Sequence, residues 1–245
     1  MAAGEPAVGL VVLSPHLDDA VLSAFCLLTE STSATVVTVC AGVPDESVPP
    51  SEYDLLTRSA SPRARVLARR AEDARVLEGL GVGHVHLDVL DSPYRTVDPQ
   101  PAELARAIAA VLPDHDTIVI PSAIGAHPDH VLTREAALLL PVVAVRLAVA
   151  DLPYAAVFGW PAIVTGRPDP PFLDPSAAWA PSLRRLAEAS GREPELIVQR
   201  LSPAQQRRKL AALHRYETQF DAQEAGPSRE ISHARRRGYE VTWRL

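Results

Sequence analysis

Short apolar runs and stretches of helical periodicity alternate along the first 150 residues. Residues 9–13 and 34–40 are uninterrupted apolar or β-branched runs, which are typical of strands buried in a parallel sheet. Between them, apolar side chains recur at helical spacing, at Ala20, Val21, Ala24, Phe25, Leu27 and Leu28. The acidic pair Asp18 and Asp19 stands in front of this stretch, where a helix dipole favours negative charge. The pattern predicts a first strand-helix-strand unit.

The alternation continues to residue 150. Residues 63–80 have a helical period and are followed by Gly81, a common helix stop. Further helices are predicted over 102–112 and 129–140, and further strands over 84–89, 117–120 and 142–150. Repeated alternation of strand and helix is typical of an α/β fold. We therefore expect a Rossmann-like, doubly wound, mostly parallel sheet with helices on both faces.

Two segments are rich in proline and lack either period. Residues 41–62, with Pro44, Pro49, Pro50 and Pro62, are predicted to form a long loop, and such loops often serve function. Residues 151–181 contain seven prolines and are expected to cap the sheet edge. We expect 151–200 to be an excursion that sets substrate specificity, before a helix over 202–216 and a short strand over 239–244. All 245 residues are expected to form one domain.

Composition narrows the function. The chain has 24 Lys and Arg against 30 Asp and Glu, a formal charge of −6, which argues against a nucleic-acid or anionic-membrane surface. No apolar run approaches the roughly 20 residues that span a bilayer, so no membrane insertion is expected. Two cysteines cannot form a disulfide framework, and residues 1–10 do not resemble a secretion signal, so we expect a cytoplasmic protein. Eight histidines are left to explain.

The first cluster of reactive residues follows the first predicted strand. Residues 14–19 read Ser-Pro-His-Leu-Asp-Asp, and open α/β sheets bind ligands at the carboxyl ends of their strands. His16 with Asp18 and Asp19 could supply two metal ligands and a free carboxylate. The alternative is a helix cap beside a solvated histidine, because Asp is common at helix starts. By itself this cluster leaves both interpretations open.

The second cluster, His-Pro-Asp-His at 127–130, follows another predicted strand in the same way. His127 and His130 are three residues apart, and Pro128 biases His127 away from the helix, so the two rings can have different roles. Both clusters reach the same edge of the predicted sheet. Two histidine nitrogens and one carboxylate, with water as fourth ligand, make a catalytic zinc-type site, and a second carboxylate beside that water is a base. This combination indicates hydrolysis.

With both clusters in view, the sequence resembles the PIG-L/LmbE-like family of metal-dependent N-deacetylases. Residues 14–19 and 127–130 are similar to the two signature motifs of that family. Residues 69–72 with 80–82 resemble its Arg/Glu helix, 38–42 its second strand and 209–219 its late helix. The resemblance extends over most of residues 8–220.

The resemblance implies a role for most residues of the two clusters. The metal ligands would be His16, Asp19 and His130. Asp18 would be the general base, and His127 would stabilise the oxyanion or assist the leaving amine. The implied cofactor is a divalent metal, zinc or iron(II), since both accept nitrogen and carboxylate ligands.

Three further residues are candidates for binding substrate. Arg69 falls where related enzymes have a substrate-contacting arginine, although a solvated helix face explains Arg69 or its neighbour Arg70 equally well. Asp91 and Arg95 follow the third predicted strand and could bind sugar hydroxyls or a charged group. A capped turn with a surface ion pair is the alternative for these two.

The sequence also departs from the family pattern. Leu17 stands where proline is common, and Ala20 stands where a glutamate is common, which leaves the ligands intact and removes one outer contact. Phe25 and Cys26 replace a common Gly-Gly pair. This replacement predicts tighter or different packing behind the site.

These observations together define the expected function. The leading hypothesis is a metal-dependent hydrolase that removes an N-acetyl or other N-acyl group from an amino-sugar substrate, such as a glycoside in natural-product tailoring. The alternatives are an amidase or phosphoesterase acting on another substrate, such as the amide of a thiol conjugate, and a catalytically silent sugar-binding module. The expected partner is a small molecule and not nucleic acid, and a homo-oligomer is left open.

Overall fold

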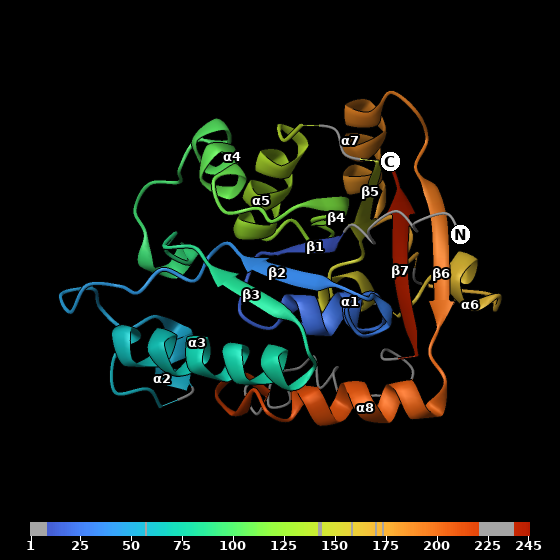
Figure 1. Ribbon diagram of the computed structural model, residues 1–245. Helices are drawn as coiled ribbons and strands as arrows, with labels where there is room; N and C mark the ends of the chain where they lie inside the picture. The colour runs from blue at the N-terminus through green and yellow to red at the C-terminus, as the bar shows by residue number, and fades with distance from the viewer. Residues whose placement is uncertain are drawn as a thin grey trace, which may run out of the picture.

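A seven-stranded sheet organises the computed structural model, which describes residues 9–56, 58–141, 144–157, 159–169, 171–172, 174–220 and 238–245 (Figure 1). The strands are β1 Gly9–Ser14, β2 Ala34–Thr38, β3 Gly83–His86, β4 His115–Pro121, β5 Val145–Val149, β6 Glu195–Arg200 and β7 Tyr239–Arg244. Their order is β3-β2-β1-β4-β5-β7-β6. The first five strands are parallel, and β7 runs antiparallel to both β5 and β6. The predicted doubly wound, mostly parallel sheet is confirmed.

Helices cover both faces of this sheet. They are α1 Asp19–Glu30, α2 Glu52–Leu56, α3 Pro62–Gly79, α4 Pro101–Ala109, α5 Pro128–Leu138, α6 Ala162–Thr165, α7 Ala180–Ser190 and α8 Pro203–Leu213, with 3-10 turns η1 Ser92–Tyr94 and η2 Tyr154–Ala156. Figure 1 shows α1, α3 and α8 on one face and α4 and α5 on the other. In the described residues, no helix has the length and apolar character needed to cross a membrane.

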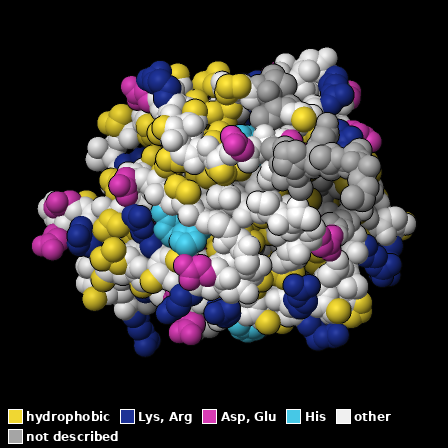
Figure 2. All heavy atoms as spheres, viewed as in Figure 1, with side chains coloured by type: hydrophobic (Ala, Val, Ile, Leu, Met, Phe, Trp, Pro, Cys, Tyr) yellow, Lys and Arg dark blue, Asp and Glu magenta, His cyan; other side chains and the backbone are white. Residues whose placement is uncertain are grey.

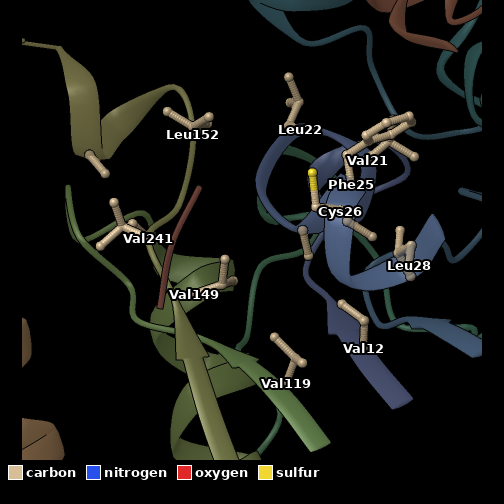
Figure 3. Packing of buried hydrophobic residues seen from close by; sticks show 14 of the residues in the cluster. Val12, Val21, Leu22, Phe25, Cys26, Leu28, Val119, Val149, Leu152 and Val241 are labelled. Carbon is tan, nitrogen blue, oxygen red and sulfur yellow. The ribbon is translucent and has the colours of Figure 1, made fainter. Parts of the chain in front are cut away.

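Alternate side chains of β1 supply the cores of the two faces. Leu10 and Val12 belong to the cluster under α1, and Val11 and Leu13 belong to the cluster under α4 and α5. Figure 3 shows Val12 in the same cluster as Phe25, which is fully buried. Because β1 is buried on both faces, it is continuously apolar, which is the pattern that identified it in the sequence.

Some predicted boundaries were wrong. Residues 41–62, expected to be a loop, contain α2, whose start is fixed by Ser51 and Asp54: the Ser51 hydroxyl accepts from the Asp54 amide (3.1 Å), and the Asp54 carboxylate accepts from the Ser51 amide (2.9 Å). This is a capping-box spacing. Residues 87–89 leave the predicted strand, and Asp88 forms an isolated bridge with Cys40. Residues 142–143 of the fifth predicted strand lie outside the described residues.

The second proline-rich segment, residues 151–181, contains more regular structure than the sequence indicated. It contains η2 and α6, and α7 begins at its end. β6, which was not predicted, follows α7 at the edge of the sheet, where it pairs with β7. Most of its residues are exposed, so it lacks the alternation that identifies a strand with one buried face.

A buried ion pair links the last strand to two helices. Lys209 of α8, the only lysine in the chain, lies 2.7 Å from Glu240 of β7, and both side chains are at most 3% exposed. The second oxygen of Glu240 accepts the backbone N–H of Cys26 (2.9 Å), just after α1 departs from helical geometry at Ala24. The carboxylate thus satisfies an amide that the irregular turn releases.

This pair gives a stability prediction. Lys209→Met removes one partner and leaves the Glu240 carboxylate buried, so we expect a loss of about 3–5 kcal/mol in the free energy of unfolding, measured by urea denaturation. Asp88→Asn is the control, because it breaks the exposed Arg70–Asp88 pair, in which Asp88 is 86% exposed. That change should cost less than about 1 kcal/mol. Equal losses in the two variants would contradict the prediction.

Candidate metal centre and active site

Side-chain and backbone hydrogen bonds fix the turn between β1 and α1. The Ser14 hydroxyl donates to the carbonyl of His16 (2.7 Å) and accepts the amide of Ala20 (3.0 Å). Asp19 Oδ2 accepts the backbone amide of His16 (2.9 Å). Asp18 stands at the N-cap position of α1 but makes no side-chain capping bond, so the helix-cap interpretation of this residue does not hold. The turn holds all three reactive side chains at the carboxyl end of β1.

Three side-chain atoms from the two sequence motifs lie close together. Asp19 Oδ2 lies 3.1 Å from His16 Nδ1 and 3.1 Å from His130 Nε2. In a four-coordinate site with bonds of about 2.0–2.2 Å, neighbouring ligand atoms lie roughly 3.3–3.5 Å apart. His130 Nε2 is buried and has no hydrogen-bond partner among the described residues, although it faces a carboxylate oxygen. Nitrogen and carboxylate donors of this kind suit a divalent cation, and the groups of described residues whose donor atoms lie close enough to hold one are His16 with His127 and His130, and His16 with Asp91 and Asp129.

Two more carboxylates orient the histidine rings. His16 Nε2 lies 3.0 Å from Asp129, and His130 Nδ1 lies 2.7 Å from Asp151. Each histidine therefore has a carboxylate partner on the nitrogen that faces away from Asp19, as metal-binding histidines usually do. The second oxygen of Asp151 accepts bonds from the Ser122 hydroxyl (2.6 Å) and the Ile124 amide (3.1 Å).

Asp151 was missed in the sequence. It lies two residues after the end of β5, at the same sheet edge as both motifs, which is the signal that could have identified it. Its only recognisable feature in the sequence was its place at the start of the proline-rich segment. A contact to His130, 21 residues earlier, depends on the packing of β5 beside β4.

The carboxylates make this site favourable for positive charge. Burial lowers the pKa of His130, but Asp19 and Asp151 outweigh burial and raise it to about 9. Burial also lowers the pKa of His16, but the carboxylates of Asp91 and Asp129 outweigh burial and raise it above its usual value. Burial would raise the pKa of Asp19, yet His130 and His16 hold it well below its usual range. A dication would be stabilised by the same negative charges.

A cavity of about 280 Å³ opens above these atoms. Six of the predicted site residues line it: His16, Asp18, Asp19, Arg69, Asp91 and His127. His130 is not among the residues that line the cavity; its side chain is 1% exposed, and its Nε2 lies 3.1 Å from Asp19. The structure thus brings the two motifs and Arg69 of α3 to one place.

The three predicted substrate residues are placed differently from one another. Arg69 lines the cavity with its guanidinium 4.5 Å above the Tyr53 ring, whereas Arg70 turns outward and pairs with Asp88. Asp91 lines the cavity, 3.5 Å from His16 Nε2.

Arg95 does not match its expectation. It is absent from the cavity lining, its side chain is 6% exposed, and it forms ion pairs with Asp129 and with Asp98 (2.7 Å). The buried carboxylate of Asp129 attracts the guanidinium inward. Arg95 therefore supports the residue that orients His16 and does not face the cavity.

His127 is arranged to donate a hydrogen bond. Its Nδ1 accepts the backbone amide of Asp129 (3.3 Å), so the neutral ring carries its proton on Nε2. Burial, followed by charge on His16 and His130, lowers the pKa of His127, which favours the neutral ring. Tyr154, which the sequence did not single out, packs its ring 5.8 Å from that of His127 and 5.3 Å from that of His130, and also lines the cavity.

The fold and this geometry define an α/β protein with a candidate metal centre at the switch point of a doubly wound sheet. The sequence model of the family described as PIG-L, GlcNAc-PI de-N-acetylase, matches residues 11–140, and the chain belongs to this family of N-deacetylases. Comparison with curated proteins gives no match.

Solved structures give the same assignment. The chain is similar to a deacetylase of the teicoplanin biosynthesis pathway in a complex with bog, with 28% identity and a TM-score of 0.71 over 96% of this chain and 97% of that one. It is similar to the A40926 pseudoaglycone deacetylase, with 27% identity and a TM-score of 0.68 over 98% and 97%. A zinc inhibited form of teicoplanin deacetylase matches with 26% identity and a TM-score of 0.68 over 96% and 97%.

The contact between Asp151 and His130 gives a test of the centre. Asp151→Asn cannot provide a carboxylate to His130 Nδ1, so we expect affinity for a divalent metal to fall about 10- to 100-fold, measured by competition with a chelator. Ser122→Ala is the matched control, because it removes a bond to the other oxygen of Asp151 and leaves the contact to His130. Unchanged metal affinity in Asp151→Asn would show that this carboxylate does not support a ligand.

Proposed function

We propose that this protein is a metal-dependent hydrolase that removes an N-acyl group from an amino sugar carried on a larger natural product. The observation that supports this best is the convergence of His16, Asp19 and His130 beside a cavity whose wall contains Asp18 and His127. The chain belongs to an N-deacetylase family, and its relatives of 26–28% identity are deacetylases of teicoplanin and A40926.

The ligands of the metal would be His16 Nδ1, Asp19 Oδ2 and His130 Nε2. A divalent cation held there would polarise the amide carbonyl and lower the pKa of a water molecule toward ~7. The donor set accepts zinc and iron(II) alike. One relative is described as zinc inhibited, which is a reason to compare the two metals directly.

Two side chains on the cavity wall would carry the proton chemistry. Asp18, which is 6% exposed, would take the proton of the attacking water as its oxygen approaches the amide carbon. The Nε2–H of His127 would donate to the amide oxygen as negative charge develops on it. The proton received by Asp18 would then pass to the departing amine. A pure binding module needs neither group, which favours catalysis over a silent sugar-binding role.

The dimensions of the cavity favour a single sugar unit. At about 280 Å³ it lies just below the roughly 300–1,000 Å³ of typical ligand sites, so it would take the acylated amino sugar and leave the rest of a glycoside outside. Arg69, fixed over Tyr53, would offer hydrogen-bond donors to the sugar, and Asp91 would offer acceptors. The walls formed by 41–62 and by 151–154 would set which sugar fits.

A substrate panel tests the reaction. We expect metal-loaded protein to release the acid from N-acyl amino sugars, and faster from the N-acylated sugar of a glycopeptide, because only that substrate extends beyond the cavity. Acid release is measured for zinc-loaded and iron(II)-loaded samples. Preferential cleavage of a thiol-conjugate amide would replace the sugar by another substrate class. No cleavage of any amide by either sample would contradict the proposed function.

Two substitutions separate the ligand from the base. Asp18→Asn should retain one metal per chain and lose turnover by about 10²- to 10⁴-fold, because it removes a proton acceptor and no ligand. His130→Ala should lose the metal itself, measured by elemental analysis after dialysis. His115→Ala is the control for removing an imidazole, since His115 does not line the cavity. Full activity in Asp18→Asn, or full metal content in His130→Ala, would refute the respective assignment.

A further inference from the structure

The backbone of the turn between β1 and α1 is held at every carbonyl from Ser14 to Asp18. Four of these five carbonyls accept bonds from nearby elements. The donors are the amides of Val39 and Cys40, just after β2, the hydroxyl of Ser14 in β1 and the amide of Leu22 in α1. The fifth, that of Leu17, accepts a bond from Gln219 Nε2 at 3.0 Å, across 202 residues of sequence. A single distant side chain therefore completes the turn.

Gln219 is itself firmly placed. It is 4% exposed and follows α8 in a short segment bonded to two buried acids of α3. The Tyr216 hydroxyl donates to Asp73 (2.7 Å), and the amide and hydroxyl of Thr218 donate to Glu72 (3.0 and 2.7 Å). These bonds fix the main chain on the amino side of Gln219, so its amide reaches Leu17 from a rigid base.

The Leu17 carbonyl has a direct mechanical link to Asp18. The carbonyl of Leu17 and the N–H of Asp18 belong to one planar peptide group, so a bond to that oxygen restricts the plane that carries the Asp18 Cα. Gln219 therefore acts on the backbone position from which the Asp18 side chain starts.

We infer that Gln219 is a positioning residue for the general base, which holds the peptide between Leu17 and Asp18 so that the Asp18 carboxylate faces the cavity. This inference rests on the proposed function, in which Asp18 accepts the proton of the attacking water. Gln219 also lines the cavity, and a direct contact with substrate would have different consequences for the kinetics. The two roles can be separated experimentally.

Gln219→Met retains the approximate shape and removes the donor. We expect kcat to fall about 10- to 100-fold, because misplacing a reacting group by a fraction of an ångström is costly, while KM stays within about threefold. Metal content should be unchanged. Gln206→Met is the matched control, because Gln206 also donates its amide to a carbonyl, that of Leu201 (2.9 Å), but does not line the cavity. Its kinetics should equal those of the wild type.

A double-mutant cycle identifies the partner. If Gln219 acts through Asp18, Gln219→Met should lower kcat less than about twofold in a protein that already carries Asp18→Asn. Losses that multiply, or a raised KM with unchanged kcat, would overturn the inference and leave the proposed function standing. An inactive wild type on the whole panel would overturn the proposed function and this inference with it.

A second variant covers the case in which Gln219→Met does not fold. Gln219→Glu keeps the length of the side chain, and its ionised carboxylate cannot donate to the Leu17 carbonyl. We expect a similar loss of kcat at neutral pH and a partial recovery, relative to the wild type, as the pH falls and the carboxyl regains a proton to donate. A ratio to wild type that is close to one at all pH values would contradict the role of the donor.

Discussion

The candidate site depends on one buried carboxylate oxygen. Oδ2 of Asp19 lies 2.9 Å from the backbone amide of His16, 3.1 Å from the ring of His16 and 3.1 Å from the ring of His130. A buried carboxylate is costly unless positive charge or hydrogen bonds compensate it. His16 belongs to the turn after β1, and His130 belongs to α5. The contacts that offset the cost of burying this oxygen therefore also hold the two sequence motifs together.

The topology explains why the sequence could locate these residues. β1 and β4 are neighbours in a parallel sheet, so His16 and His130, which follow them, meet at one edge. Apolar runs and motif positions were enough to predict this. They could not predict Asp151, Gln219 or the direction of Arg95, because these depend on which side chains meet across 21 to 202 residues or on which way one guanidinium turns. β6 escaped prediction because an exposed edge strand lacks alternation.

Packing behind the site accommodates a departure from the family pattern. Phe25 and Cys26, which stand where a Gly-Gly pair is common, are fully buried in the cluster under α1 (Figure 3). Because α1 departs from helical geometry at Ala24, the backbone N–H of Cys26 donates to the Glu240 carboxylate. In this structure these two side chains lie against the sheet, and the Lys209–Glu240 ion pair contacts the helix that begins with Asp19.

Separate contacts govern the candidate ligands and the candidate base. Asp129 and Asp151 contact the histidines on the nitrogens that face away from Asp19, whereas the Gln219 side chain donates to the peptide that leads to Asp18. The cavity wall meets the second set at one point, because the Tyr53 hydroxyl lies 3.5 Å from the Gln219 carbonyl, while Arg69 packs on the Tyr53 ring. On the face shown in Figure 2, acidic and basic side chains are interspersed over the described surface. Because residues that share a partner are coupled, a substitution at Tyr53 would act on the support of the base as well as on the cavity wall, whereas the contacts of Asp129 and Asp151 with the histidines do not include Tyr53.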